Sequence, residues 1–197
     1  AYTYKQPVRE ALDKLKDFKD HWGYGFSAIS TPIFAVFLPL GIQWLARALG
    51  SKHIIPEPLR HLPILLAFWA YRGVEIDLLY RLQAWAWGTE KAIGTLAIKV
   101  LIDQGVFVML WAIPSMVAVL LFKDCGYSIG RARAELGRRW YRSRCVPILV
   151  VNWVVWVPVV MVIYSLPPGL QIPVMNINVC LFVLLVMFIT KKPATDP

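Results

Sequence analysis

The chain has few of the residues that cofactor and metal sites require. It contains three cysteines and three histidines among 197 residues. Cys125, Cys145 and Cys180 form neither a C-x-x-C pair nor a zinc-ligand spacing; a Cys125–Cys145 bridge is conceivable, but free thiols are the preferred interpretation. The histidines lie in or beside polar segments, whereas a membrane haem needs paired axial ligands at membrane depth. The sequence therefore predicts no metal and no cofactor.

Catalytic motifs are also missing. The sequence contains no G-x-S-x-G, no P-loop and no G-x-G-x-x-G in a strand–turn–helix context. An enzyme is therefore the least favoured class, and we expect a protein that is not an enzyme.

Acidic residues are scarce: 12 Asp and Glu stand against 21 Lys and Arg, a net charge of +9. In a soluble protein this excess would suggest nucleic acid. Here much of it lies in one loop between apolar runs, which favours contact with anionic lipid and a topological signal. No nucleic-acid partner is expected.

Apolar residues are abundant: they make up 58% of the chain. Runs such as 105-GVFVMLWAIPSMVAVLLF-122 are continuous, without the alternation of barrel strands. Because backbone groups in lipid must bond within their own segment, these runs predict spanning helices. The fold class expected is an all-α integral membrane protein.

Five transmembrane helices are predicted within one membrane domain, residues 27–197, with four as the alternative. Five crossings give the larger asymmetry of Lys and Arg between the two sides, so we prefer five. Pro32, Pro39 and Pro114 are expected to bend their helices, and Pro167-Pro168-Gly169 to break the chain. The expected spans are 27–49, 59–87, 92–122, 147–166 and 170–190.

Residues 1–26 form an amphipathic N-terminal segment. Val8, Leu12, Leu15 and Trp22 follow helical spacing, and charges of both signs fill the other face. We expect this helix to lie on the membrane surface or, slightly favoured, to pack on a neighbouring subunit. The chain begins at Ala1 and shows no signal peptide, so we expect either an N-terminus processed after import into an organelle or the loss of the initiating Met alone. The imported organelle protein is favoured.

Polar and ionisable residues inside the expected spans are the candidate functional residues, because such groups are costly in a bilayer. One interpretation is a polar pathway lined by them. The favoured interpretation is that the charges pair along their own helices, at spacings of three and four residues, and hold helices or subunits together. The residues concerned are Arg72, Glu75, Asp77, Arg81, Lys99, Asp103 and Gln104.

The loop 123–146 is strongly basic. It can serve as a topology determinant, and it can also grip phospholipid headgroups such as cardiolipin. The two roles are compatible. The candidate headgroup ligands are Arg131, Arg133, Arg138, Arg139, Arg142 and Arg144.

Three motifs in order along the chain carry a family resemblance. They are Gly73 with Tyr80 and Arg81, then 99-KVLIDQG-105, then 152-NWVVWVP-158. Over about residues 62–192 the chain resembles the Mpv-seventeen family, which includes the twenty-two-kilodalton peroxisomal membrane protein. The resemblance implies a small helical protein of mitochondrial inner, peroxisomal or plastid membranes, and channel-like conduction is the activity usually proposed for the family.

Several polar positions of that family pattern are replaced here. Met109 stands where the family has proline, and Met161, Tyr164-Ser165 and Leu184-Leu185 replace other polar positions. This erosion is typical of a diverged member retained for packing. We therefore expect a non-catalytic accessory subunit of a respiratory-chain assembly in the mitochondrial inner membrane, in contact with lipids and other subunits. The alternatives are a plastid or peroxisomal membrane and a channel or carrier for ions or small metabolites.

Overall fold

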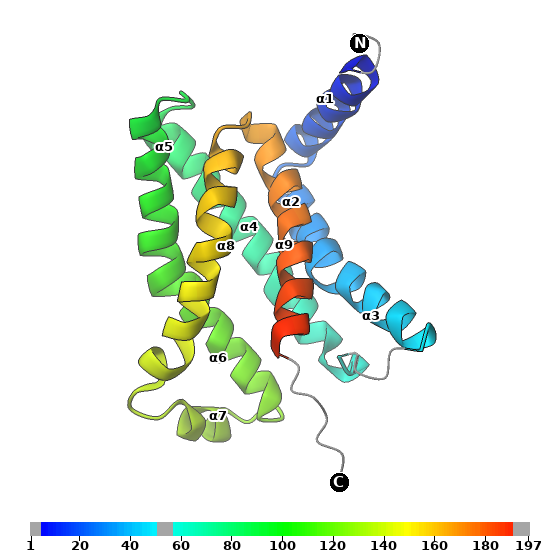
Figure 1. Cartoon of the computed structure of the whole chain (residues 1–197), viewed down its shortest axis with the longest axis vertical. Helices are drawn as coiled ribbons and strands as arrows, with labels where there is room; N and C mark the ends of the chain where they lie inside the picture. The colour runs from blue at the N-terminus through cyan, green and yellow to red at the C-terminus, as the bar shows by residue number, and fades with distance from the viewer. Residues whose placement is uncertain (1–4, 51–56, 191–197) are drawn as a thin grey trace. The chain divides into compact units, whose positions relative to one another are not determined.

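A computed structural model describes the backbone of residues 5–50 and 57–190, and the side chains of residues 10, 13–50 and 57–184. Every regular element in this part of the chain is a helix (Figure 1). The all-helical prediction is confirmed there. Val8 and Leu12 of the expected apolar face lie outside the described side chains.

The chain divides into two compact units, of which the first comprises Ala1–Arg81 and Pro167–Pro197. Gly23 separates the N-terminal helix from the next one. Its φ of 52° is a backbone conformation that glycine adopts without a steric cost. The elements of the first unit are α1 (Lys5–Trp22), α2 (Tyr24–Pro32), the π-helical η1 (Ile33–Phe37), α3 (Leu38–Ala48), the 3₁₀ turn η2 (Leu59–His61), α4 (Leu62–Trp87, up to Arg81) and α9 (Pro168–Thr190).

The second unit comprises Leu82–Leu166. Its core gathers Val108, Ile113, Val117, Cys145 and Leu149. Within this unit, α8 (Val146–Tyr164) packs against α5 (Ile93–Val100) and η3 (Leu101–Ala112) (Figure 1). Its elements are the end of α4, α5 (Ile93–Val100), the π-helical η3 (Leu101–Ala112), α6 (Ile113–Asp124), α7 (Ile129–Leu136), the π-helical η4 (Tyr141–Cys145) and α8 (Val146–Tyr164).

Within the described residues, three helical stretches are long and apolar enough to cross a membrane: Tyr24–Ala48, Ile93–Asp124 and Tyr141–Tyr164. They contain most of the predicted spans 27–49, 92–122 and 147–166. The predicted spans 59–87 and 170–190 are also helical, as α4 and α9. However, α4 carries four charged residues between Arg72 and Arg81, and α9 is apolar over Pro168–Leu184. The count of five spans therefore stays a prediction.

Each π-helical segment ends two residues before a proline near the start of the next α-helix. Pro39 follows η1, Pro114 follows η3 and Pro147 follows η4. Inside an α-helix the proline ring collides with the carbonyl four residues earlier, and wider π-helical turns relocate that carbonyl. The bends expected at Pro39 and Pro114 thus take the form of local widening in continuous helices.

Three features of the loops and breaks differ from the prediction. The basic loop 123–146 contains α7, because Ser128 caps its first turn by accepting the Arg131 N–H at 3.4 Å. The loop ends early, because helical structure resumes at Trp140 rather than at residue 147. The break expected at Pro167-Pro168-Gly169 is also shorter, since Pro168 begins α9, where a missing N–H costs nothing. All three cysteines are free thiols.

Candidate functional site

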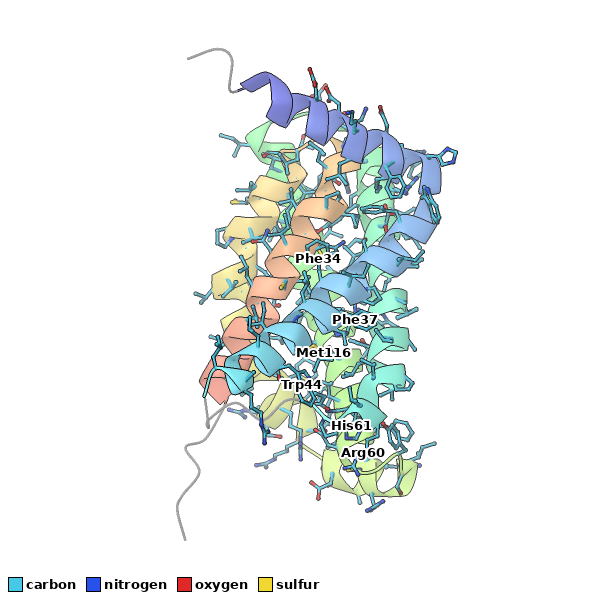
Figure 2. The ribbon with its side chains drawn as sticks, turned by 90° about the vertical axis from the view of Figure 1, so that its right-hand side faces the viewer. Phe34, Phe37, Trp44, Arg60, His61 and Met116 are labelled. Atoms are coloured by element: carbon cyan, nitrogen blue, oxygen red, sulfur yellow. The ribbon has the colours of Figure 1, made fainter. Side chains whose placement is uncertain are left out.

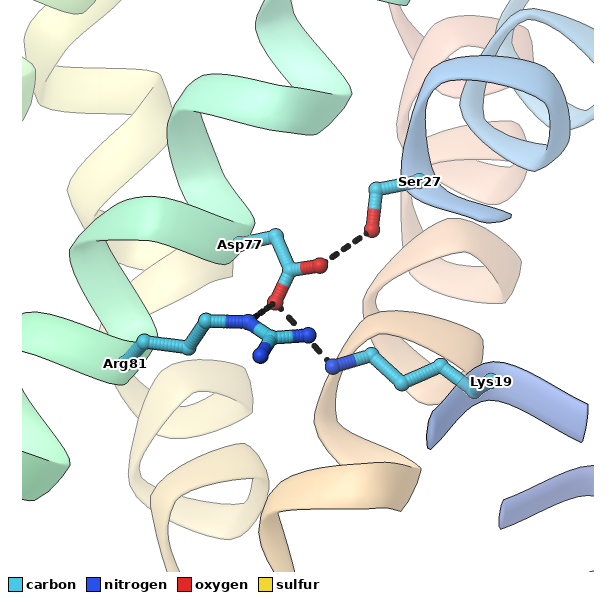
Figure 3. Close-up of polar contacts among 4 residues, drawn as sticks. All are labelled: Lys19, Ser27, Asp77 and Arg81. Carbon is cyan, nitrogen blue, oxygen red and sulfur yellow. Dashed lines mark hydrogen bonds and ion pairs between the residues drawn. The ribbon is translucent and has the colours of Figure 1, made fainter. Parts of the chain in front are cut away.

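Asp77 is the centre of a buried polar cluster in the first unit (Figure 3). Its side chain is 1% exposed and accepts three contacts. Lys19 Nζ from α1 and Arg81 Nε from α4 both lie 3.0 Å from Oδ1. Ser27 Oγ from α2 donates to Oδ2 at 2.6 Å. One carboxylate therefore joins three helices that are separate along the chain.

The sequence analysis found only part of this cluster. The expected pairs within α4 are both present, Arg72 with Glu75 and Asp77 with Arg81. The contact from Lys19 was missed because it lies 58 residues away in an exposed-looking amphipathic helix. In the structure Lys19 is 3% exposed, so α1 packs on the helices of its own unit through a buried charge.

Arg72 occupies a second buried position on α4. Its guanidinium pairs with Glu75 and lies 5.1 Å from the centre of the Phe68 ring, an arrangement that favours a cation. Glu75 in turn accepts from the Tyr71 hydroxyl at 2.9 Å. The charge is satisfied along a single helix, as its spacing predicts.

A neutral cluster lies next to the Asp77 cluster along α2. Asn176 of α9 is fully buried; its Oδ1 accepts from Thr31 Oγ1 at 2.9 Å and its Nδ2 donates to Ser30 Oγ at 2.8 Å. A Cβ atom on Gly73 would overlap the Ser27 carbonyl oxygen and the Thr31 side chain. Gly73 thus lets α4 approach α2 closely, which is a physical reason for glycine at this position.

Asp103 is the centre of the polar cluster in the second unit. It is 5% exposed and both carboxylate oxygens are occupied. Gln104 Nε2 donates to Oδ1 at 2.7 Å, and the Tyr164 hydroxyl donates to Oδ2 at 2.8 Å. Tyr164 accepts in turn from Gln83 Nε2 at 2.6 Å, and Asn152 Nδ2 donates to Gln104 Oε1 at 2.9 Å. The four hydrogen bonds thus form two chains, each of which ends at the Asp103 carboxylate.

Lys99 does not pair with Asp103 in the part of the chain that the structure describes. Its ammonium donates to the carbonyl of Gly88, at 2.6 Å, just beyond the end of α4. Helical side chains point toward the N-terminus of their helix, so Lys99 extends away from Asp103. A cation at a helix C-terminus is favourable in its own right. The expected ion pair is replaced by a helix cap.

Two of the sequence motifs meet at this cluster. Gln104 receives the Asn152 amide on its side chain and the Trp153 indole N–H on its carbonyl, the latter at 3.0 Å. The roles of Tyr164 and Gln83 were missed, because Tyr164 was noted only as a replaced position of the family pattern and Gln83 belongs to no motif. The packing of helices brings Tyr164 to Asp103 and Gln83 to Tyr164. The Gln83 side-chain oxygen is buried and has no hydrogen-bond partner among the described residues.

The two clusters are equipped to accept hydrogen bonds and ion pairs. Within the described residues no group of three His, Cys, Asp or Glu is placed to hold a metal. Comparisons with protein-family models, with curated proteins and with solved structures give no match to this chain. Function must therefore be argued from the contacts alone.

The basic loop has a different character. Five of its six candidate arginines are exposed, and the sixth, Arg144, pairs with Glu135 at 3.2 Å. None of the five exposed guanidinium groups has a hydrogen-bond or ion-pair partner among the described residues. The cations buried between helices are thus bonded within the fold, whereas the five exposed arginines of this loop can bind another molecule.

Proposed function

We propose that the protein is a non-catalytic structural subunit of a larger membrane assembly. The observation that supports this most is Asp77, whose two oxygens are occupied by donors from α1, α2 and α4. A carboxylate that is 1% exposed and held in this way joins helices and is closed off from solvent. Asp103 has the same character, with Gln104 and Tyr164 on its two oxygens.

The outer surface of the apolar helices suits such a subunit. Large side chains such as Phe37, Trp44 and Leu45 are between about half and two-thirds exposed. Figure 2 shows Phe37 and Trp44 following Phe34 along the helix Tyr24–Ala48. In a bilayer this surface faces lipid or a neighbouring helix, and its cost in water is removed.

The setting is proposed to be an organellar membrane crossed by five helices, with α4 and α9 among them. A respiratory-chain assembly of the mitochondrial inner membrane is the leading setting, and plastid or peroxisomal membranes are the alternatives. We also propose a diverged member of the Mpv-seventeen family. This is supported by the contact of Gln104 with Asn152 and Trp153, which joins two of the resembling motifs, and by the close packing at Gly73.

Native-gel migration tests the proposal. Organelle membranes carrying this chain would be solubilised mildly, and the band that contains it would be analysed by mass spectrometry. We expect a large assembly with partners in fixed stoichiometry. Migration at 22.4 kDa or a small multiple of it would refute the proposal.

A channel or carrier is the second candidate, and one observation favours it. The buried Gln83 oxygen has no partner in the described part of the chain, although it adjoins Tyr164 and Asp103. A hydrated pathway would supply the missing donor. Flux through liposomes should then fall in Asp103→Asn, while Asp124→Asn, whose side chain is 63% exposed, should be silent. Unaltered flux in Asp103→Asn, or loss of assembly alone, would exclude this candidate.

A further inference from the structure

The most concentrated unsatisfied charge in the described part of the molecule lies between two apolar helices. Arg131 and Arg133 belong to α7, and Arg138, Arg139 and Arg142 follow it. All five side chains are exposed, and their guanidinium groups have no hydrogen-bond or ion-pair partner among the described residues. By contrast, the buried Lys19, Arg72 and Lys99 are all bonded within the fold.

The loop is held in place at its C-terminal end and through α7. The Tyr141 hydroxyl donates to the Met109 carbonyl at 2.8 Å, and Trp140 packs against the core of the second unit. Ala132 is buried and α7 packs on α6, so α7 is fixed against the rest of the second unit. Arg144 bonds Glu135 across the return of the chain. The exposed arginines therefore lie on a segment that these contacts hold against the second unit.

The position of this loop relative to a membrane follows from the helices on either side. Ile93–Asp124 ends immediately before the loop and Tyr141–Tyr164 begins immediately after it, and both are long and apolar enough to cross a membrane. If both cross, as the proposed function requires, the arginines lie at a headgroup layer. Ile129, 75% exposed, and Tyr127, 42% exposed, add apolar groups on the same segment, as interfacial helices do.

We infer that this surface binds the phosphodiester headgroups of anionic phospholipids in its own membrane. The guanidinium group matches phosphate with two parallel N–H donors, and five such groups face a layer rich in phosphate. The ligand set is Arg131, Arg133, Arg138, Arg139 and Arg142. Arg144 does not belong to this set, because it forms an ion pair with Glu135 within the loop. The sequence alone did not separate these two roles.

The test uses the full chain reconstituted in nanodiscs of phosphatidylcholine with a minority of phosphatidylglycerol or cardiolipin. Native mass spectrometry of the released protein gives the preference for anionic over neutral lipid. Each basic residue near an anionic surface contributes about fivefold in affinity, so R138Q/R139Q should lower the preference by about 25-fold. R138K/R139K should lose a smaller part, because charge remains while the paired donors are lost.

The matched control removes two exposed and unpaired cations elsewhere, in R47Q/K91Q, and should lower the preference less than the loop variant does, because these two cations are single and do not form a cluster. An equal loss in control and loop variants would overturn the inference, since only net charge would matter. An unchanged preference in R138Q/R139Q would overturn it in favour of a topology signal alone. So would displacement of the lipid by inorganic phosphate at matched ionic strength, which would make the site a general phosphate site.

The proposed function has a separate readout in the same experiment. Wild-type protein that fails to insert into the nanodisc would refute the membrane setting. Protein that inserts with no lipid preference would refute the lipid site alone.

Discussion

Replacing Asp77 by Asn should destabilise the first unit strongly. The substitution keeps the shape of the side chain and removes the charge that Lys19 and Arg81 share. Lys19 is 3% exposed and would be left as an uncompensated buried cation. Breaking a buried pair in this way costs about 3–5 kcal/mol. Arg81 contributes little to that figure, because its side chain is 43% exposed and can turn to solvent, which limits the pair to about 1 kcal/mol.

The assay is the free energy of unfolding of the purified protein in mixed micelles, titrated with a denaturing detergent. Asp77→Asn should lower it by about 3–5 kcal/mol and Arg81→Gln by less than about 1 kcal/mol. Lys19→Met in the Asp77→Asn background should recover much of the loss, because it removes the orphaned ammonium. A loss below about 1 kcal/mol in Asp77→Asn would refute the reasoning. So would a double variant no more stable than the single one.

Three further predictions use the same assay. Gly73→Ala should cost about 1–3 kcal/mol by overlap with α2, whereas Gly94→Ala, in open space within α5, should be neutral or stabilise by up to about 1 kcal/mol; equal effects would contradict the close approach. Tyr164→Phe should cost about 1–3 kcal/mol and much less in an Asp103→Asn background, and additive losses would contradict the shared hydrogen bond. Asn176→Ala should cost about 1–3 kcal/mol, and a neutral result would contradict its two bonds to α2.

The local part of this structure was predictable from short-range rules. The helical pairs Arg72–Glu75 and Asp77–Arg81 follow from spacings of three and four residues on one helix. Long apolar runs predict long helices because backbone groups can bond within their own segment. Such rules need no knowledge of which helices are neighbours.

Residue spacing predicted the contacts less well where the helix is not a regular α-helix. It also failed where a group on another element is the bonding partner. Lys99 and Asp103 are four residues apart, yet Lys99 caps α4 and Asp103 bonds Tyr164. The basic loop was expected to be irregular, yet Ser128 begins a helix within it. In each case a nearby backbone group or side chain offered a better partner than the one the spacing suggested.

By itself, the sequence determined the helical class, the apolar stretches, the buried charges Arg72, Asp77, Lys99 and Asp103, and the basic loop between two of the apolar stretches. These follow from periodicity and composition, which act over a few residues. Only the tertiary structure decided that Lys19 and Ser27 meet Asp77, that Asn176 meets Thr31, and that Tyr164 meets Asp103. Such contacts depend on how helices far apart in the chain pack, and many arrangements of similar apolar surfaces satisfy the same sequence pattern.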